Sequence, residues 1–113
     1  MKGSNQLFKG TLTTIVLKLL SEQGKMYGYE ITKKVKEQTN GSLVLTEGAL
    51  YPALHKLEAD GLLKVNIEQV GNRSRKYYSL TSDGKKEVKA KLKELNEFFA
   101  QMQILLNLKP SAL

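Results

Sequence analysis

The chain of 113 residues has no cysteine, no tryptophan, one histidine and two prolines. The absence of cysteine excludes disulfides, thiolate zinc sites and cysteine nucleophiles. The single histidine, His55, leaves no histidine-based metal cluster and no Ser-His-Asp triad, so we expect no metal and no cofactor. No apolar run is long enough to cross a membrane and no signal-peptide pattern is found, so we expect a cytoplasmic protein without a membrane partner.

Positive charge is in excess, with 18 Lys and Arg residues against 11 Asp and Glu residues and a net charge of +7. This balance favours a polyanionic partner, with nucleic acid ahead of an anionic membrane. The length predicts one domain. A single core of this size is often marginal, and oligomerisation is a common way to stabilise it.

Apolar periodicity and turn residues predict three helices, a β-hairpin and a long last helix. The helices are expected over 5–22, 27–38, 46–61 and 83–108, with a strand-like bridge at 43–45 and a hairpin formed by 62–69 and 75–80. The order predicts a mainly α fold with a small β-hairpin. We interpret residues 1–81 as a winged helix-turn-helix DNA-binding domain and 82–113 as a C-terminal dimerisation helix, together forming one compact unit.

The third helix has the features of a recognition helix, which needs one buried face and one face free to reach base edges. Leu50, Leu54 and Leu57 recur at helical spacing and form the expected buried face, and Thr46 is a good N-cap. The opposite side carries Glu47, Gly48, Tyr51, Pro52, His55 and Lys56. A proline inside a helix costs about 3 kcal/mol. Near the N-terminal part it loses one backbone bond, and its exposed ring can pack on a thymine methyl or a sugar.

Several positions of this helix have a second interpretation. Pro52 could mark a kink between two short helices, Tyr51 could be a half-buried packing residue, and His55 could be an ordinary surface residue. Glu47 could accept a hydrogen bond from a cytosine amino group, or it could repel phosphate and set the orientation. The sequence leaves these alternatives open.

The hairpin tip carries three cations, Arg73, Arg75 and Lys76, beside the turn residues Gly71 and Asn72. Such a tip suits phosphate contacts or insertion into a minor groove. Alone it would be a solvated charged turn. Because it follows a helix-turn-helix pattern at the right distance, we interpret it as a wing.

The last helix carries a heptad pattern of apolar residues, widened by Phe98 and Leu105. Its seam consists of Val88, Leu92, Leu95, Phe99, Met102 and Leu106. This is more apolar surface than so small a core can cover. The helix is therefore expected to pair with a second chain.

Three blocks of the sequence, MYGYEI (26–31), TEGALYPALHKLEADGLL (46–63) and RKYYSLTSDGKK (75–86), resemble the PadR family of bacterial transcriptional regulators. The resemblance covers nearly the whole chain and is to the short subgroup with a single C-terminal helix. It implies a homodimer whose N-terminal and last helices form the dimer contacts. Each recognition helix would enter a major groove of a pseudo-palindromic operator. Most members repress transcription, and some respond to phenolic or aromatic compounds.

The resemblance also assigns roles to positions of this chain. The DNA-facing positions would be Tyr27, Tyr29, Lys33, Thr46, Gly48, Tyr51, Pro52, His55, Lys56, Arg73, Arg75 and Lys76. The dimer interface would combine Leu12, Ile15 and Leu19 with Val88, Leu92, Leu95, Phe98, Phe99, Met102 and Leu106. Drug-binding members of the short subgroup can use a tryptophan at the dimer centre, which this chain lacks. Phe98, Phe99 and Met102 could bind an effector instead, with ordinary heptad packing as the alternative.

The predicted function is a sequence-specific regulator that binds double-stranded DNA, a repressor released by a small aromatic or hydrophobic effector. One alternative is a winged-helix adaptor that binds another protein through its last helix. Another is a winged helix that binds RNA. We expect no enzyme, because the acid pairs Glu58–Asp60 and Glu94–Glu97 lie on polar helix faces or beside a glycine cap, without a nucleophile-base pair.

Overall fold

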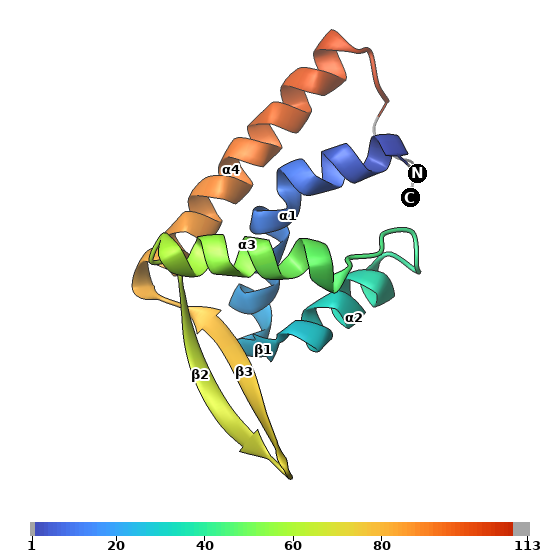
Figure 1. The fold of residues 1–113 in the computed structure, drawn as a ribbon. Coiled ribbons are helices and arrows are strands. Elements are labelled where there is room, and N and C mark those ends of the chain that lie inside the picture. Colours follow the sequence, from blue (N-terminus) through green and yellow to red (C-terminus); the bar gives the residue numbers. More distant parts are fainter. Residues whose placement is uncertain (1, 110–113) are drawn as a thin grey trace.

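A computed structural model describes residues 2–109 (Figure 1). The elements follow in the order α1 (Lys2–Gln23), β1 (Lys25–Tyr27), α2 (Gly28–Gln38), α3 (Glu47–Ala59), β2 (Leu63–Val70), β3 (Arg73–Leu80) and α4 (Ser82–Leu105). The mainly helical prediction is confirmed. A winged helix-turn-helix of α2, α3 and the β2–β3 hairpin packs on α1, and the long α4 follows it.

The three strands form an antiparallel sheet in the order β1-β3-β2. Strands β2 and β3 pair over their whole length, from Leu63 opposite Leu80 to Val70 opposite Arg73. Gly71 makes the tight turn possible with a positive φ of 62°. The hairpin packs on the core only at its base, and its tip projects away from the helices as a wing (Figure 1).

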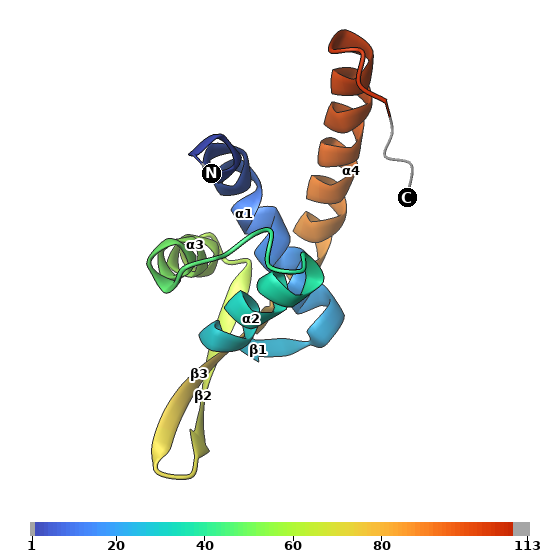
Figure 2. The same ribbon diagram turned by 90° about the vertical axis from the view of Figure 1, so that its right-hand side faces the viewer.

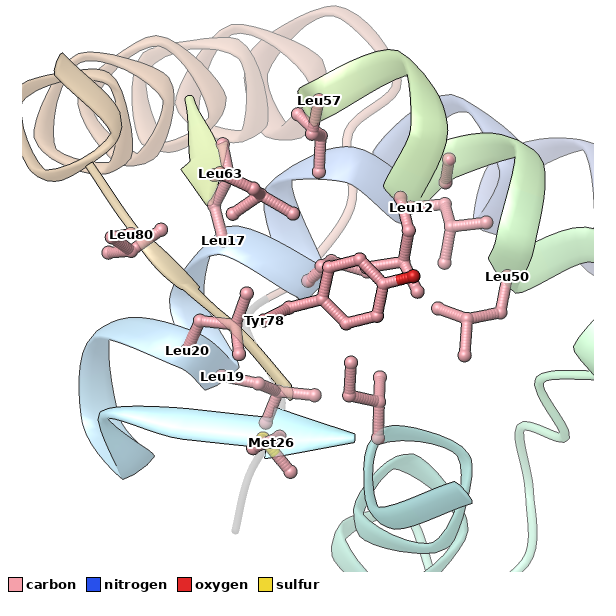
Figure 3. Close-up of a cluster of buried hydrophobic side chains, with 14 of the residues drawn as sticks. Leu12, Leu17, Leu19, Leu20, Met26, Leu50, Leu57, Leu63, Tyr78 and Leu80 are labelled. Carbon is pink, nitrogen blue, oxygen red and sulfur yellow. The ribbon is translucent and has the colours of Figure 1, made fainter. Parts of the chain in front are cut away.

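One hydrophobic core joins α1, α2, α3 and the base of the sheet (Figure 3). Its largest fully buried side chains are Tyr78, Leu17, Leu20, Ile31, Leu50, Leu54 and Val16. The predicted buried face of α3 is confirmed, because Leu50, Leu54 and Leu57 all lie in this core. The core therefore fixes α3 with its opposite face turned to solvent.

Helix α4 packs on α1, and Val88 in its N-terminal half is buried. The two helices then diverge (Figure 2). Beyond Leu95, every α4 side chain except that of Met102 is exposed. This half of α4 also carries Phe98, Phe99, Ile104 and Leu105, so a strip of apolar surface faces solvent.

The predicted strand-like bridge at 43–45 is wrong, and the third strand is β1 instead. Residues 43–45 form a loop held by Thr39, whose Oγ1 accepts a hydrogen bond from the Leu43 backbone N at 3.1 Å. Strand β1 was not predicted, because three residues are too few to show an alternation of apolar and polar side chains. Met26 of β1 pairs with Tyr78 and is buried.

Helix ends differ from the prediction by a few residues. Helix α1 begins at Lys2, α2 begins at Gly28, and α4 ends at Leu105 rather than 108. Pro110, the predicted end signal, lies outside the described residues. Among residues 2–109, no helix combines the length and the apolar character needed to cross a membrane.

Candidate nucleic-acid interface

Helix α3 begins with a side-chain cap and continues through its proline. The Thr46 Oγ1 accepts a hydrogen bond from the Ala49 backbone N at 3.2 Å. Pro52 lies inside one continuous helix, so it does not separate two short helices. A residue with an N–H at position 52 would donate to the Gly48 carbonyl. Because Gly48 and Pro52 are both exposed, water can satisfy that carbonyl.

The free face of α3 contains every residue predicted for it. Thr46, Glu47, Gly48, Tyr51, Pro52, His55 and Lys56 are all exposed. The Lys56 ammonium lies 3.2 Å from an Asp60 carboxylate oxygen, an exposed pair one helical turn apart. Both partners are exposed, and surface pairs of this kind are weak. The ion pair with Asp60 therefore does not prevent Lys56 from binding another anion.

Tyr51 is partly exposed and also packs on a neighbouring helix. It is 36% exposed, yet its hydroxyl end packs on the backbone of Gly28, the first residue of α2. A Cβ at residue 28 would lie 2.5 Å from the Tyr51 Oη. This contact joins the recognition helix to the start of the supporting helix, and it was not predicted.

A cavity of about 220 Å³ lies between the start of α2, α3 and the wing. It is lined by Tyr27, Gly28, Tyr51, Ser74, Arg75, Lys76 and Tyr78. The start of α2, helix α3 and the wing therefore meet around one concave surface, with Lys76 and several hydroxyl-bearing residues in its lining. Two of the three predicted wing cations, Arg73 and Lys76, are exposed.

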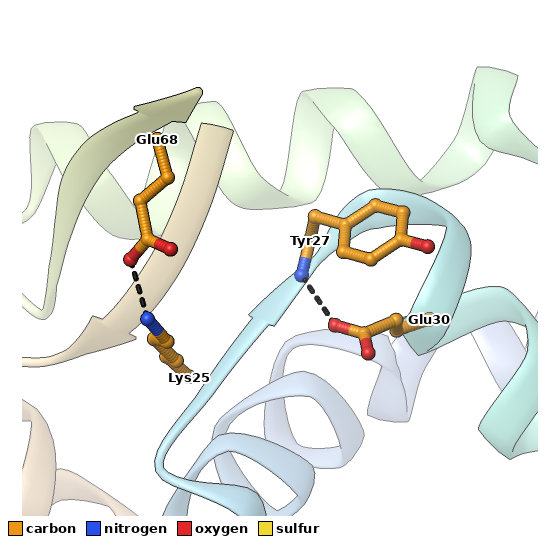
Figure 4. Close-up of polar contacts among 4 residues, drawn as sticks. All are labelled: Lys25, Tyr27, Glu30 and Glu68. Carbon is orange, nitrogen blue, oxygen red and sulfur yellow. Dashed lines mark hydrogen bonds and ion pairs between the residues drawn. The ribbon is translucent and has the colours of Figure 1, made fainter. Parts of the chain in front are cut away.

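Arg75 is in a different environment, as part of an outer cluster formed by Lys25, Tyr27, Glu68, Arg75 and Tyr77. The Arg75 guanidinium lies 4.3 Å from the centre of the Tyr27 ring. The Tyr27 and Tyr77 rings meet edge to face at 5.5 Å, and the Lys25 ammonium lies 4.8 Å from the centre of the Tyr77 ring. Lys25 also pairs with Glu68 (Figure 4). The cluster thus connects all three strands.

Two backbone and electrostatic features support the outer cluster. The Tyr27 backbone N donates to Glu30 Oε1 at 3.1 Å, which caps the start of α2 (Figure 4). A hydrogen bond with Glu68 raises the pKa of Lys25, and a hydrogen bond with Tyr77 raises the pKa of Arg75. Both groups therefore stay cationic, and only Tyr27 and Arg75 of this cluster were singled out by the sequence.

The other residues predicted on α2 are on its outer surface. Tyr29 is exposed, and its ring stacks near that of Tyr27 at 6.4 Å between centres. Lys33 is exposed one turn further along. Tyr29 and Lys33 line another pocket, together with Val44 and Leu45 from the loop before α3, and neither lines the cavity beside the wing.

The predicted dimer residues differ in their exposure to solvent. Leu12, Leu19 and Val88 are 6%, 4% and 5% exposed, so they belong to the core of the protomer and offer a partner little surface. Ile15, Leu92, Leu95 and Met102 are partly buried, whereas Phe98, Phe99 and Leu106 are exposed. Helical periodicity could not separate core from interface, because both need the same spacing.

A groove of about 630 Å³ separates α1 from α4. Its apolar lining comes from Leu7, Leu95 and Phe98, and Gly10 with threonine, glutamine and charged side chains forms the rest. Of the three residues predicted to bind an effector, Phe98 lines this groove, whereas Phe99 and Met102 do not. Leu7, which the interface prediction omitted, is exposed at the groove.

Comparison with known proteins agrees with this architecture. The Transcriptional regulator PadR-like family matches residues 16–90, from the middle of α1 into α4. A transcriptional regulator from Clostridium thermocellum is 33% identical, with a TM-score of 0.77, over 90% of this chain and 95% of that chain. A PadR family regulator from Eggerthella lenta is 26% identical, with a TM-score of 0.83, over 96% of this chain and 92% of that chain.

A further solved structure is that of Bacillus subtilis PadR in complex with operator DNA. It is 32% identical to this chain and has a TM-score of 0.65. The similarity covers 72% of this chain and 46% of the B. subtilis protein, so this chain matches about half of that longer protein.

Proposed function

The chain belongs to the PadR-like family of transcriptional regulators, and we propose that it is a homodimeric repressor that binds a pseudo-palindromic operator in double-stranded DNA. Of the described residues, those up to 81 would form the DNA-binding unit, and α4 would form the dimerisation helix. The observation that carries this proposal is the free face of α3, which stands beside a cavity and a wing rich in cations.

The recognition helix would enter the major groove through its N-terminal half. Gly48 has open space where a side chain would be, because a Cβ there would have only the Thr46 Oγ1 nearby, at 4.0 Å. The DNA backbone or a base edge can therefore approach closely. Pro52 and His55 follow on the same face. Arg73 and Lys76 would contact phosphates from the wing, and the net charge of +7 favours the approach of DNA.

A homodimer would place two such faces about 34 Å apart, one turn of DNA. The exposed apolar strip on α4 supports this arrangement, because a monomer would leave Phe98, Phe99 and Leu105 in water. Leu7 on α1 extends the same surface across the groove. A second copy of α4 and α1 fits this chemistry. Repression would then be steric, through occupancy of the operator.

A small aromatic or hydrophobic effector would release the repressor. The groove between α1 and α4 offers Phe98 and two leucines among polar side chains, which suits a planar ligand with polar groups. Because both helices contribute to the dimer surface, a ligand there would favour a different spacing of the subunits. It can shift the population only by its difference in affinity for the two arrangements.

The first experiment is a binding titration of the full chain with its own upstream DNA and with scrambled DNA of equal length, at two salt concentrations. We expect preference for the upstream DNA, two chains per site and affinity that falls steeply with salt. His55→Ala and Arg73→Gln should weaken binding, whereas Lys89→Gln on the exposed surface of α4 is the matched control.

Equal and weak binding to both DNAs would contradict operator recognition and leave only charge-driven association. A reporter gene behind the upstream DNA separates repression from activation. Addition of 1-naphthol tests the groove: release of DNA by wild type but not by Phe98→Ala would support effector binding there. Release that is the same in both proteins would contradict it.

A further inference from the structure

We propose that Arg75 is a positioning residue, which ties the wing to the start of α2 through the ring of Tyr27 and does not bind a DNA phosphate. This inference rests on the proposed DNA-binding function. It changes the role that the sequence suggested for Arg75, which was a phosphate contact or insertion into a minor groove, as for Arg73 and Lys76.

The contact between Arg75 and Tyr27 lies where β1 stops pairing with β3. Strand β1 pairs with β3 only as far as Tyr27 opposite Tyr77. Beyond Tyr77, the last residues of the wing have β2 as their only neighbouring strand. Arg75 is two residues nearer the tip than Tyr77 and on the same face of β3. Its contact with Tyr27 therefore extends the support of β1 toward the tip.

The contacts of the guanidinium explain why it is suited to this role. The guanidinium carbon lies 4.3 Å from the centre of the Tyr27 ring, and that ring in turn meets the Tyr77 ring edge to face. An arginine on an aromatic face is attracted to the ring quadrupole. Lys76 is on the opposite face of the strand, and both Lys76 and Arg73 are exposed, whereas Arg75 is partly buried.

Tyr27 is rigid enough to hold the wing because three separate elements fix it. It is the last residue of β1, its backbone N is bonded to Glu30, and its ring meets Tyr77 edge to face. Since α2 packs directly on α3, a wing tied to Tyr27 keeps a set distance from the recognition helix. The tie therefore lets helix and wing contact the same duplex together.

The dependence of operator affinity on salt separates positioning from phosphate contact. A phosphate contact that is lost lowers the slope of log affinity against log salt by about 1. We expect Arg75→Gln to weaken binding about two- to fivefold at every salt concentration, with the wild-type slope, because contacts within the protein are lost and no phosphate contact is. Arg73→Gln is the matched control and should lower the slope. A slope for Arg75→Gln reduced by about 1 would overturn the inference.

A second measurement uses the protein without DNA, so that failure of the inference and failure of the proposed function can be told apart. Amide hydrogen exchange in β2 and β3 should accelerate in Arg75→Gln and in Tyr27→Leu. It should stay at the wild-type rate in Tyr27→Phe, which keeps the ring, and in Lys76→Gln, which lies on the other face. Unchanged exchange in Arg75→Gln would overturn the tie even if operator binding were established. Wild type that fails to bind operator DNA would overturn the proposed function alone.

Discussion

The hydroxyl of Tyr51 occupies the space that a side chain at Gly28 would need. A Cβ built on Gly28 would lie 2.5 Å from the Tyr51 Oη and 3.0 Å from its Cζ, closer than van der Waals contact allows. Because Gly28 begins α2 and Tyr51 lies on α3, the missing side chain sets how closely the recognition helix approaches its support. Glycine is needed here for space, since its φ is not positive.

Gly28→Ala should therefore destabilise the protein by about 1–3 kcal/mol, because Tyr51 must leave its place or α2 must shift. The free energy of unfolding from urea titration measures this effect. In the double variant with Tyr51→Ala the clash is absent, so the cost of Gly28→Ala should be largely removed. The same cost in both backgrounds would show that Tyr51 is not the cause.

Gly48→Ala should have opposite effects on stability and on DNA binding. The nearest side-chain atom is the Thr46 Oγ1 at 4.0 Å, so alanine fits and should stabilise α3 by up to about 1 kcal/mol through its helix propensity. If DNA approaches this position closely, the added methyl group should weaken operator binding. Urea unfolding and a binding titration on the same preparation test both effects. Tighter binding that follows the gain in stability would contradict close approach at Gly48.

The local elements of this fold could be predicted because their causes are local. Leu50, Leu54 and Leu57 form the buried face of α3 as their spacing indicates, and Thr46 caps the helix through its own side chain. Gly71 marks the hairpin turn by its conformation. Each signal lies within a few residues of the structure that it specifies.

The rest depends on contacts between residues far apart in the sequence. Strand β1 is stable only because β3 pairs with it, and Lys25 contacts Glu68 and Tyr77 only after the sheet has formed. The closeness of Gly28 to Tyr51 depends on how α2 packs against α3. The helical spacing of Leu12 fits a position in the core as well as one in an interface. Leu12 is buried in the core of the protomer because of the way α1 packs.

The dimer proposal predicts a strong effect of charge on the exposed seam of α4. Phe99 is 54% exposed in the protomer, so Phe99→Glu should leave the protomer fold intact. In a dimer that covers this seam, the carboxylate would be buried without a partner, at a cost of roughly 3 kcal/mol or about 100-fold in the dimer dissociation constant. Sedimentation over a concentration series measures this change. Ala100→Glu adds the same charge at the neighbouring exposed position and should have little effect. An equal shift in both variants would contradict a seam at Phe99.

Tyr78 should make stability fall at alkaline pH. Burial raises its pKa above the usual value of 10.0, with smaller contributions from Tyr51 and Glu58. Above that pH the unfolded chain loses the Tyr78 proton while the folded chain keeps it, so the unfolded state binds fewer protons and stability decreases as pH rises. The stabilising contribution is complete below pH 10 and is lost as the pH rises through the pKa of the folded state, at a slope of at most about 1.4 kcal/mol per pH unit for one proton.

Tyr78→Phe keeps the ring in the core but has no proton to lose. Urea unfolding of both proteins across this range should show a smaller decrease for the variant. Parallel decreases would mean that the Tyr78 hydroxyl titrates in the folded protein as it does in the unfolded chain.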